Sequence, residues 1–546
     1  MGAVFIILMI CGLIVVHELG HFLVARAMGV HVTEFAVGVG PRILTWKGRA
    51  QHPDLPPTEY VLALLPFGGY VKMLGYDPGD EVPPGVEAVS FAHKAVWRRF
   101  LIMVAGPAFN LILPFFLFFS VGLGESRLES SVVGTADPDW PAWKAGIRPG
   151  DRIVAIDGEP VAYWWQLRDR IGGRAGESVP VTVERAGARR DLVVSPIASL
   201  DNVVPGVLEY RRGRIGVEAR ASRPLVGVEP GSVAAAAGVA SWDRLLAVGD
   251  RPVRSIDEAL EAVGRDATAP VKVTLLAWRP APVDGLRVSL ATPRVVTLPP
   301  APGARGLFAA DCLVFDVMPE SPAARLGLVK GDRVLAVGDQ PCVAWSFAAR
   351  YLHTHRAEPV AVTWQRGGER LSGTLSHATI PWPNARDQGA ERPIHGITVL
   401  HERLPPELVD NEAPLAYAVH RMFQGTFDAI GGTVAMLGGL LTGRVAVKDG
   451  LGGPVLIGQL AAEAGEAGWD KFFALMAGIS VSLGVINLLP IPLLDGGQIL
   501  FLAIEGIRRR PVSVRVRMIA TYLGLAFIIA LMVIVLRNDI ARVWGG

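Results

Sequence analysis

The chain has 546 residues, of which 51% are hydrophobic and 19% are charged, with a formal net charge of +2 and a mean hydropathy of +0.37. This length predicts several domains, and the composition is too apolar for an ordinary soluble protein and too charged for a bundle lying wholly in a membrane. The near-neutral charge does not indicate nucleic acid as a partner. The three cysteines form no disulfide framework and have no zinc-ligand spacing. Whether Cys312 and Cys342 form a disulfide in an oxidising compartment stays undecided, since a disulfide requires close Cα atoms and the sequence does not show their distance.

The first predicted element is a membrane span from Ala3 to Ala25, since a span needs about 20 apolar residues. Its stretch VVHELGHFLV places His17, Glu18 and His21 within this apolar sequence. The two histidines are four residues apart and face the same side of a helix, while Glu18 lies about 100° around it. This H-E-x-x-H pattern is typical of two zinc ligands and a general base.

Ionisable groups at the centre of a span cost about 2.5–3.5 kcal/mol each on insertion scales. Three of them together would not persist there without partners. We therefore favour a metal site over the alternative, in which the histidines form hydrogen bonds between helices beside a neutralised glutamate.

The segment 31–75 is predicted to form a small β-sheet associated with the membrane. Its stretches TEFAVGVG and TEYVLALLPFGGYVKM read as strands interrupted by glycine rather than as a span. An edge strand in this region could hold a substrate extended and satisfy its backbone groups. Residues 101–123 follow as an uncharged second span and complete a first membrane half at 1–124.

The long segment 125–471 contains a repeat at intervals of 92 and 89 residues. The copies are GIRPGDRIVAIDGEPV (146–161), GVASWDRLLAVGDRPV (238–253) and GLVKGDRVLAVGDQPC (327–342). Each has a short alternating strand between two turns, which indicates a small domain used three times. These segments resemble PDZ domains of the bacterial periplasmic type, at 125–220, 221–303 and 304–400. PDZ domains bind peptides by strand addition, so peptides are candidate ligands, although three structural domains without a ligand remain an alternative.

The segment 401–471 is predicted to be an amphipathic or interfacial helical region. Its stretch Ile430–Gly443 is apolar but too short to span, so we expect it to lie in the interface, the alternative being a buried helix of a soluble domain. A second membrane half at 472–546 follows, with uncharged spans at 472–494 and 518–536.

A third zinc ligand is expected from the sequence NLLPIPLLDGGQIL at 487–500. A catalytic zinc usually takes three protein ligands and a water, and Asp495 is the first acidic residue after the uncharged third span. Prolines 490 and 492 prevent a regular helix there, so protein rather than lipid must satisfy the backbone. Spans one and three run in the same direction, so this carboxylate can reach the depth of the histidines. The alternative is a loop aspartate that caps a helix.

Lysine and arginine in the short loops predict the orientation of the chain. The segment between spans one and two and the loop after span three are both rich in these residues, which indicates the cytoplasmic side. Both chain ends and the segment 125–471 are then extracytoplasmic. The sequence predicts a multi-pass α-helical membrane protein with four transmembrane helices, a small membrane-associated β-sheet and an inserted tandem of mixed α/β PDZ-like domains.

Five stretches in order resemble the site-2 protease family (peptidase family M50), in its bacterial branch that regulates sigma-E. They are HELGH, LPFGGYVKM (65–73), AGPAFN (105–110), LGGPV (451–455) and NLLPIPLLDGG (487–497). The resemblance implies a zinc endopeptidase in which His17, His21 and Asp495 bind Zn²⁺ and Glu18 is the catalytic base. It also implies that Asn487, and with it Pro490, Gly68 and Gly69, help to position an unwound substrate.

The resemblance further implies the biological setting. The substrate would be a single-span membrane protein such as an anti-sigma factor, already trimmed by an upstream site-1 protease, in the bacterial inner membrane. The active site would lie near the cytoplasmic side. Members of this branch commonly carry one or two PDZ domains, whereas this chain has three, which leaves the substrate in doubt but not the chemistry. Two rival functions are a membrane-anchored PDZ adaptor with a vestigial metal site and a metal transporter; clustered ligands at one end disfavour the transporter.

Overall fold

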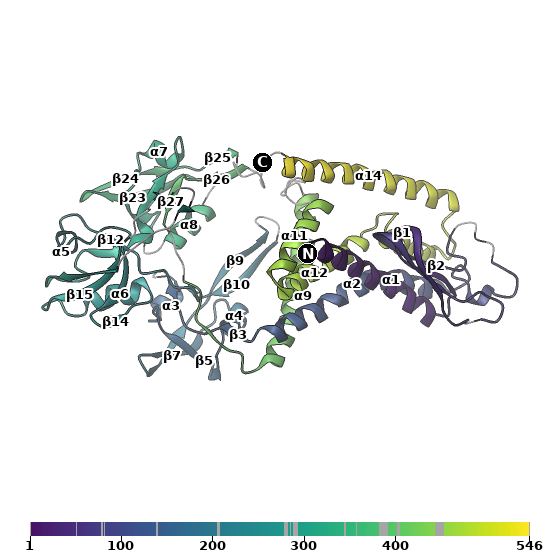
Figure 1. Ribbon diagram of the computed structural model, residues 1–546, viewed down its shortest axis with the longest axis horizontal. Helices are drawn as coiled ribbons and strands as arrows, with labels where there is room; N and C mark the ends of the chain where they lie inside the picture. The colour runs from purple at the N-terminus through teal and green to yellow at the C-terminus, as the bar shows by residue number, and fades with distance from the viewer. Residues whose placement is uncertain are drawn as a thin grey trace.

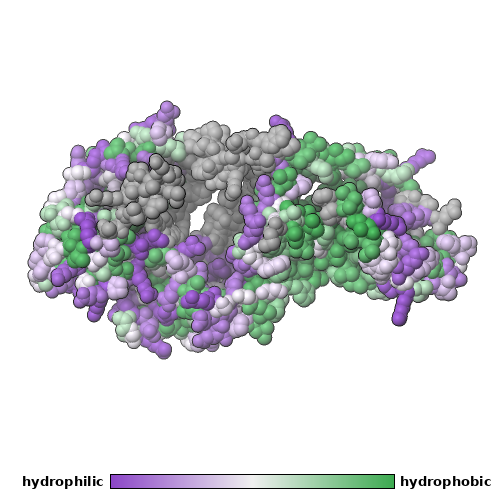
Figure 2. Space-filling model, viewed as in Figure 1, coloured by the Kyte–Doolittle hydropathy of each residue, from purple (hydrophilic) through white to green (hydrophobic). Residues whose placement is uncertain are grey.

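The computed structural model describes residues 2–544, without 51, 78–79, 81, 138–139, 205–207, 278–281, 284–285, 288–292, 343–344, 356–357, 382–390, 401–403 and 443–452. The molecule is elongated (Figure 1), with a group of long helices at one end and a group of small α/β units at the other. Apolar residues gather over the helices and polar residues over the units (Figure 2). This division confirms the predicted class of a multi-pass membrane protein with an inserted set of PDZ-like domains.

Four helices are long and apolar enough to cross a membrane among the described residues, as predicted. They are α1 (Gly2–Ala27), α2 (Val96–Gly124), α12 (Trp469–Asn487) and α14 (Val514–Trp544). The third differs from the predicted span at 472–494, because α12 ends at Asn487 and a turn leads into α13 (Asp495–Arg508). Pro490 and Pro492 in this turn lack a backbone N–H and so interrupt the helix.

A further long helix, α9 (Pro414–Leu441), packs along α2. The rings of Phe115 and Phe423 meet at 5.7 Å, and the hydroxyls of Thr433 and Ser482 lie 3.2 Å apart. The apolar stretch from Ile430 is thus the second half of a 28-residue helix rather than a separate short one, because the first half is anchored on α2. Gly443 and the first two residues of LGGPV lie outside the described residues, and the chain resumes in α11 (Pro454–Ala467).

The segment after α1 forms the predicted sheet from two bent strands, β1 (Val32–Lys47) and β2 (Glu59–Met73). Residues 32–37 pair with 69–73 and also with 59–62, and 42–47 pair with 59–63. The two strands thereby make four adjacent segments, with 69–73 outermost on one side. This outer segment is the part of the sheet that approaches α1 near Glu18.

Three units of one architecture form the insert, each with a four-stranded antiparallel sheet. The sheet orders are β6-β5-β7-β8, β14-β13-β15-β18 and β22-β21-β23-β24, so the same strand order occurs three times. The strands are β5 (Arg152–Ile156), β6 (Glu159–Pro160), β7 (Val179–Arg185), β8 (Ala188–Val194), β13 (Arg244–Val248), β14 (Arg251–Pro252), β15 (Val271–Leu276), β18 (Pro293–Leu298), β21 (Arg333–Val337), β22 (Gln340–Pro341), β23 (Val360–Arg366) and β24 (Glu369–Leu375).

In each unit a first short strand pairs with a last one and closes the fold. These pairs are β4 (Thr135–Ala136) with β11 (Val217–Glu218), β12 (Val226–Val228) with β19 (Leu307–Ala309), and β20 (Val314–Val317) with β27 (Ile397–Val399), and they bound units 1, 2 and 3. Unit 2 therefore extends past the predicted boundary at 303, because β19 at 307–309 pairs with β12 of that unit.

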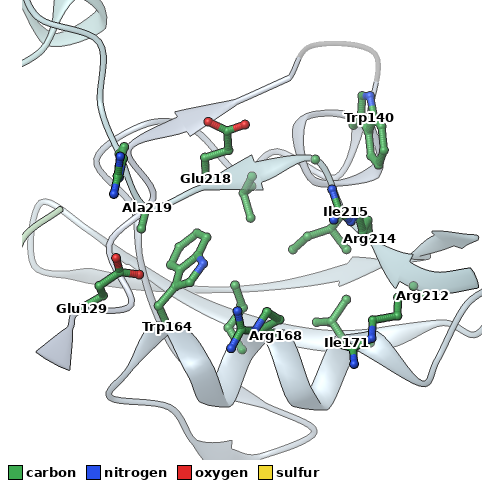
Figure 3. A pocket seen from close by; sticks show the side chains of 16 residues that line it. Glu129, Trp140, Trp164, Arg168, Ile171, Arg212, Arg214, Ile215, Glu218 and Ala219 are labelled. Carbon is green, nitrogen blue, oxygen red and sulfur yellow. The ribbon is translucent and has the colours of Figure 1, made fainter. Parts of the chain in front are cut away.

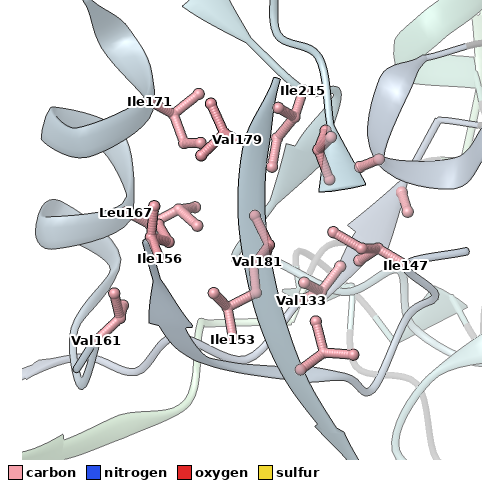
Figure 4. Close-up of a cluster of buried hydrophobic side chains, with 14 residues drawn as sticks. Val133, Ile147, Ile153, Ile156, Val161, Leu167, Ile171, Val179, Val181 and Ile215 are labelled. Carbon is pink, nitrogen blue, oxygen red and sulfur yellow. The ribbon is translucent and has the colours of Figure 1, made fainter. Parts of the chain in front are cut away.

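Each unit has a core of its own, and one longer helix covers it: α4 (Trp164–Gly172), α6 (Ile256–Gly264) or α8 (Trp345–Thr354). In unit 1, Leu167 and Ile171 of α4 face Val179 and Val181 of the sheet (Figure 4). The alternating strand pattern produces this arrangement, since every second residue points to the same face.

The insert leaves and rejoins the helices at one place. β3 (Arg127–Glu129), directly after α2, pairs antiparallel with β28 (Leu408–Asp410), directly before α9. The start of α1 and the end of α14 lie at the end of the helices that faces the units (Figure 1). All three units are thus a single insertion between α2 and α9.

Candidate metal centre

Three side chains that are distant in the sequence meet between α1 and α13. His17 Nε2 lies 3.1 Å from Asp495 Oδ2, and His21 Nε2 lies 3.4 Å from Asp495 Oδ1. One ligand atom from each residue lies within 4.8 Å of the others. The structure therefore brings together the three residues that the sequence suggests as zinc ligands.

The close packing of two glycines against the preceding turn positions Asp495. Asp495 is the first residue of α13, and residues 488–494 fold back over the first turn of that helix. A Cβ atom at Gly496 would lie 2.1 Å from the carbonyl oxygen of Leu489, and one at Gly497 would lie 2.4 Å from that of Ile491. Only glycine fits at both places, so the sequence Asp-Gly-Gly fixes where the carboxylate enters the site.

Two groups on α2 orient the imidazoles. His21 Nδ1–H donates to the main-chain carbonyl of Ile102 at 2.8 Å, and the side-chain amide of Asn110 lies 3.0 Å from His17 Nδ1. In both rings the contact at Nδ1 leaves Nε2 directed toward Asp495. Such contacts fix the tautomer and ring orientation of metal-binding histidines.

Asn110 is not among the predicted site residues, although it lies in AGPAFN. Its side chain is completely buried, and its main-chain oxygen accepts a hydrogen bond from the Ser480 hydroxyl at 2.7 Å. Its Oδ1 atom has no hydrogen-bond partner among the described residues. The signal that could have identified it is a lone amide at the centre of an apolar span, which needs a partner there.

Small residues allow α1 and α2 to approach closely at this depth. A Cβ atom at Gly106 would lie 2.3 Å from His21 Nε2, and one at Gly20 would lie 2.4 Å from the carbonyl oxygen of Ala105. Gly106 is also part of AGPAFN, so that stretch contributes both the space for one histidine and the amide beside the other.

The outer β-segment 69–73 passes directly beside Glu18. A Cβ atom at Gly69 would lie 2.9 Å from Glu18 Cγ and 2.7 Å from Ile14 Cγ2. Gly68 precedes it with φ of +96°, a conformation that favours glycine. Asn487 ends α12 half-buried and Pro490 is exposed in the following turn, and both lie outside the cluster of three ligand atoms.

The two histidines and Asp495 lie close enough to share one metal ion. His17 Nε2 and His21 Nε2 approach different oxygens of the Asp495 carboxylate, at 3.1 and 3.4 Å, and one ligand atom from each residue lies within 4.8 Å of the others. A histidine that binds metal through Nε2 carries its proton on Nδ1, and half a turn of the Asn110 amide brings its unpartnered Oδ1 to accept that proton. Two imidazoles and one carboxylate are also a donor set that suits zinc.

A polar pocket of about 280 Å³ lies beside α13, on the side of the arginine-rich loop after it. Its lining includes Tyr76, Arg99, Gln498, Glu505 and Arg517. Arg99 and Glu505 form an ion pair at 2.7 Å, and Arg517 donates to Gln498 at 2.8 Å. Burial raises the pKa of Tyr76 to about 12, and the carboxylate of Asp495 adds to the shift, so this phenol stays neutral.

A separate groove of about 330 Å³ lies in unit 1 (Figure 3). Trp164, Arg168 and Ile171 of α4 form one wall, and the segment Arg212–Arg220, which includes β11, forms the other. The groove runs between a helix and a short strand, which is an arrangement that can accept an extended peptide by strand addition.

The comparisons with known proteins agree with this geometry. The chain is 30% identical over 533 residues to the regulator of sigma-E protease RseP of Salmonella typhimurium, covering 97% of this chain and 96% of that protein. The corresponding protein of Escherichia coli K12 is 30% identical over 550 residues with the same coverage, and a putative zinc metalloprotease of Vibrio cholerae is 28% identical over 542 residues.

A crystal structure of a PDZ domain protein from Parabacteroides distasonis is also similar, but with a TM-score of 0.12 and 11% identity it supports no assignment. The model of peptidase family M50 matches residues 5–531. That match spans α1 to α14 and includes all three residues of the cluster. The chain therefore belongs to peptidase family M50, as a metalloprotease of the site-2 type.

Proposed function

We propose that this protein is an intramembrane zinc endopeptidase that cuts a membrane-tethered, previously trimmed regulator such as an anti-sigma factor. The observation that carries this proposal is the meeting of His17, His21 and Asp495 beside Glu18 and the outer β-segment 69–73. The same cluster disfavours an adaptor with a vestigial site, because all three ligands, the base and the supporting contacts on α2 are present together.

The residues of the chain divide the chemistry among them. His17, His21 and Asp495 would hold Zn²⁺, which supplies a water of lowered pKa and polarises the scissile carbonyl. Glu18 lies one residue from His17 on the same turn, so it can take the proton from the attacking water and return it to the leaving amine. Asn110 and the carbonyl of Ile102 hold the two imidazoles in place during these steps.

Substrate must be extended before it can be cut, because a helical span keeps its carbonyls in hydrogen bonds. The outer segment 69–73 offers backbone groups at the edge of a sheet, immediately beside Glu18. Gly69 keeps that edge close to the base, since a larger residue would collide with Glu18. Asn487 and Pro490, on the turn that leads to Asp495, would hold the other side of the substrate, as the family resemblance implies.

The lysine and arginine residues of the short loops support an orientation in which the metal-binding end of the bundle is cytoplasmic and the units lie in the periplasm of a bacterium. The pocket of about 280 Å³ beside α13 supports a route for water from that side. Upstream trimming by a site-1 protease would leave a substrate stump small enough to pass the units. The groove of unit 1 is a candidate site for a peptide ligand.

A cleavage assay on single-span candidate substrates tests the proposal, with zinc analysis of the same purified protein. We expect cleavage by the native chain and none by Glu18→Gln, although that variant should retain zinc. Zinc transport into vesicles without cleavage would indicate a transporter. A chain that neither cuts any candidate nor holds zinc would be an adaptor, and the proposal would be wrong.

A further inference from the structure

Cys312 and Cys342 lie side by side at the joint between units 2 and 3. Their Sγ atoms are 3.1 Å apart, and the Cys312 thiol also donates to the main-chain carbonyl of Cys342 at 2.9 Å. Cys312 is 3% exposed, whereas Cys342 is partly exposed. Both are free thiols in the structure, and the remaining cysteine, Cys11, lies in α1.

The position of this pair is a junction rather than the interior of one unit. Cys312 ends a short 3-10 turn (Ala310–Cys312) that directly follows the last strand of unit 2, and Ala310 N–H donates to Leu225 of unit 2 at 3.0 Å. Cys342 directly follows β22 of unit 3, and its N–H donates to Leu335 of that sheet at 2.8 Å. A bond between the two sulfurs would tie the turn that leaves unit 2 to the sheet of unit 3.

Noncovalent contacts already join the two units at the same joint. Arg333 of unit 3 forms an ion pair with Glu229 of unit 2 at 2.9 Å and stacks over the ring of Phe308 at 3.8 Å. Trp242 of unit 2 meets Phe315 of unit 3 edge-on at 5.7 Å. These contacts are partly exposed and individually weak, so a covalent link would change how firmly the joint is held.

We infer that Cys312 and Cys342 are a redox modification site, at which a reversible disulfide locks unit 3 onto unit 2. The oxidant is a disulfide of the small-thiol or dithiol-oxidoreductase class. The more exposed Cys342 thiolate attacks it, one oxidant thiol leaves with a proton, and Cys312 then displaces the second thiol from the mixed disulfide. Two electrons and two protons pass from the cysteines to the oxidant, and the Cys312–Cys342 bond forms.

Burial and the neighbouring thiol agree with this order of events. The contact with Cys342, together with burial, raises the pKa of the Cys312 thiol well above its ordinary value. A buried, protonated thiol is a poor first nucleophile but is correctly placed to resolve a mixed disulfide on its neighbour.

The test uses the purified full chain in buffers of reduced and oxidised glutathione, so its result does not depend on membrane orientation or on catalysis. Free thiols are counted by alkylation after denaturation and peptide mass analysis, with Cys11 as an internal reference. We expect oxidised glutathione to protect Cys312 and Cys342 together, reductant to restore both, and Cys342→Ser to leave Cys312 free. Free thiols on both residues under excess oxidant, or a stable glutathione adduct on Cys342, would overturn the inference.

Locking of the joint is measured on the same samples by limited proteolysis between units 2 and 3. Oxidation should slow cutting near residues 310–313 at least several-fold in the native chain and have no effect in Cys342→Ser or Cys312→Ser. Tryptophan fluorescence identifies a serine variant that has not folded. The other serine variant is then used as the control. A disulfide that forms without slowing this cut would disprove the locking role.

Discussion

The helices and the three units differ in how their polar side chains are arranged. In the helices a few buried polar groups converge on one point, and each contacts the next: Asn110 with His17, His17 and His21 with Asp495. In the units one fold is repeated, and equivalent positions carry different side chains. A site that performs chemistry at membrane depth has no freedom to vary its groups, whereas a repeated scaffold tolerates variation wherever each core can adapt.

One position shows how far the units differ. A glycine with positive φ begins the last strand region of each unit, and a Cβ atom there would lie 2.1 Å from the N-cap residue of a short helix. These glycines are Gly216, Gly306 and Gly396. The residue before each is Ile215, Arg305 or His395 respectively.

Those three residues are held in different ways. Ile215 packs in the core of unit 1, and Arg305 is 1% exposed and donates to four main-chain carbonyls, including those of Pro299 and Ala269. His395 accepts a hydrogen bond from Ile397 N–H at 3.0 Å and lies beside Trp345. The units thus share a backbone but not the chemistry of their closing turns.

The largest effect is expected at the convergent site. His17→Ala, His21→Ala and Asp495→Asn should each lose zinc and reduce cleavage to background, because two ligands do not hold a catalytic zinc. Glu18→Gln should keep zinc and lose cleavage, since it removes the base and leaves the ligands in place. Metal analysis beside a cleavage assay measures both, and loss of zinc from Glu18→Gln would show that its role is misassigned.

The units are expected to be dispensable for chemistry but to exclude large substrates. Residues 130–407 can be replaced by a short turn, because β3 and β28 already pair and would close as a hairpin. The shortened protein should cut a short-tailed substrate about as well as the native chain and should also cut an untrimmed one. If the shortened protein still does not cut the long-tailed substrate, the units do not exclude large substrates. If it no longer cuts the short-tailed substrate, the units instead recognise the new C-terminus of the trimmed substrate by strand addition.

Asn110→Leu removes the amide beside His17 at nearly constant volume and should weaken zinc binding by about 10–100-fold, as for other outer contacts of metal-binding histidines. Chelator competition on the purified protein measures this affinity without relying on activity. Ser120→Ala is a matched control, because Ser120 lies on the same helix and its hydroxyl donates to the main-chain carbonyl of Phe116, one turn earlier. Equal zinc affinity in both variants would show that Asn110 does not contribute to zinc binding.

The smallest effect is expected on the stability of unit 3 when the pH is lowered. Burial, and then the nearby His377, lowers the pKa of His395 to about 4 from 6.5. The unfolded chain binds this proton below about pH 6.5 and the folded unit does not, so stability is complete above that pH and falls toward pH 4. The loss is roughly 2 kcal/mol at about pH 5.

Hydrogen exchange resolved by peptide measures this loss, with units 1 and 2 as an internal reference because residues 125–309 contain no histidine. His395→Gln should abolish the pH dependence of unit 3, and His355→Gln, in the same unit, should preserve it. An unchanged pH dependence in His395→Gln would assign the effect to another group.

The sequence by itself determined the presence of the four spans, the repeat and the three candidate ligands. A span is recognisable because its length and apolar composition are imposed by the bilayer, and H-E-x-x-H is recognisable because one helix turn fixes the spacing of its side chains. The turn at Pro490 and Pro492 was also visible, although the end of α12 at Asn487 was not, because the terminal turn depends on the packing of the glycines after Asp495.

Only the tertiary structure decided which distant groups meet. Nothing in the sequence places Asn110 against His17, Gly69 against Glu18, or Cys312 against Cys342, since these contacts arise where helices and units pack. The extent of α9 and the strand that closes unit 2 were likewise set by partners far along the chain. Local patterns specify an element because its period is local, whereas contacts between elements depend on packing that no single segment encodes.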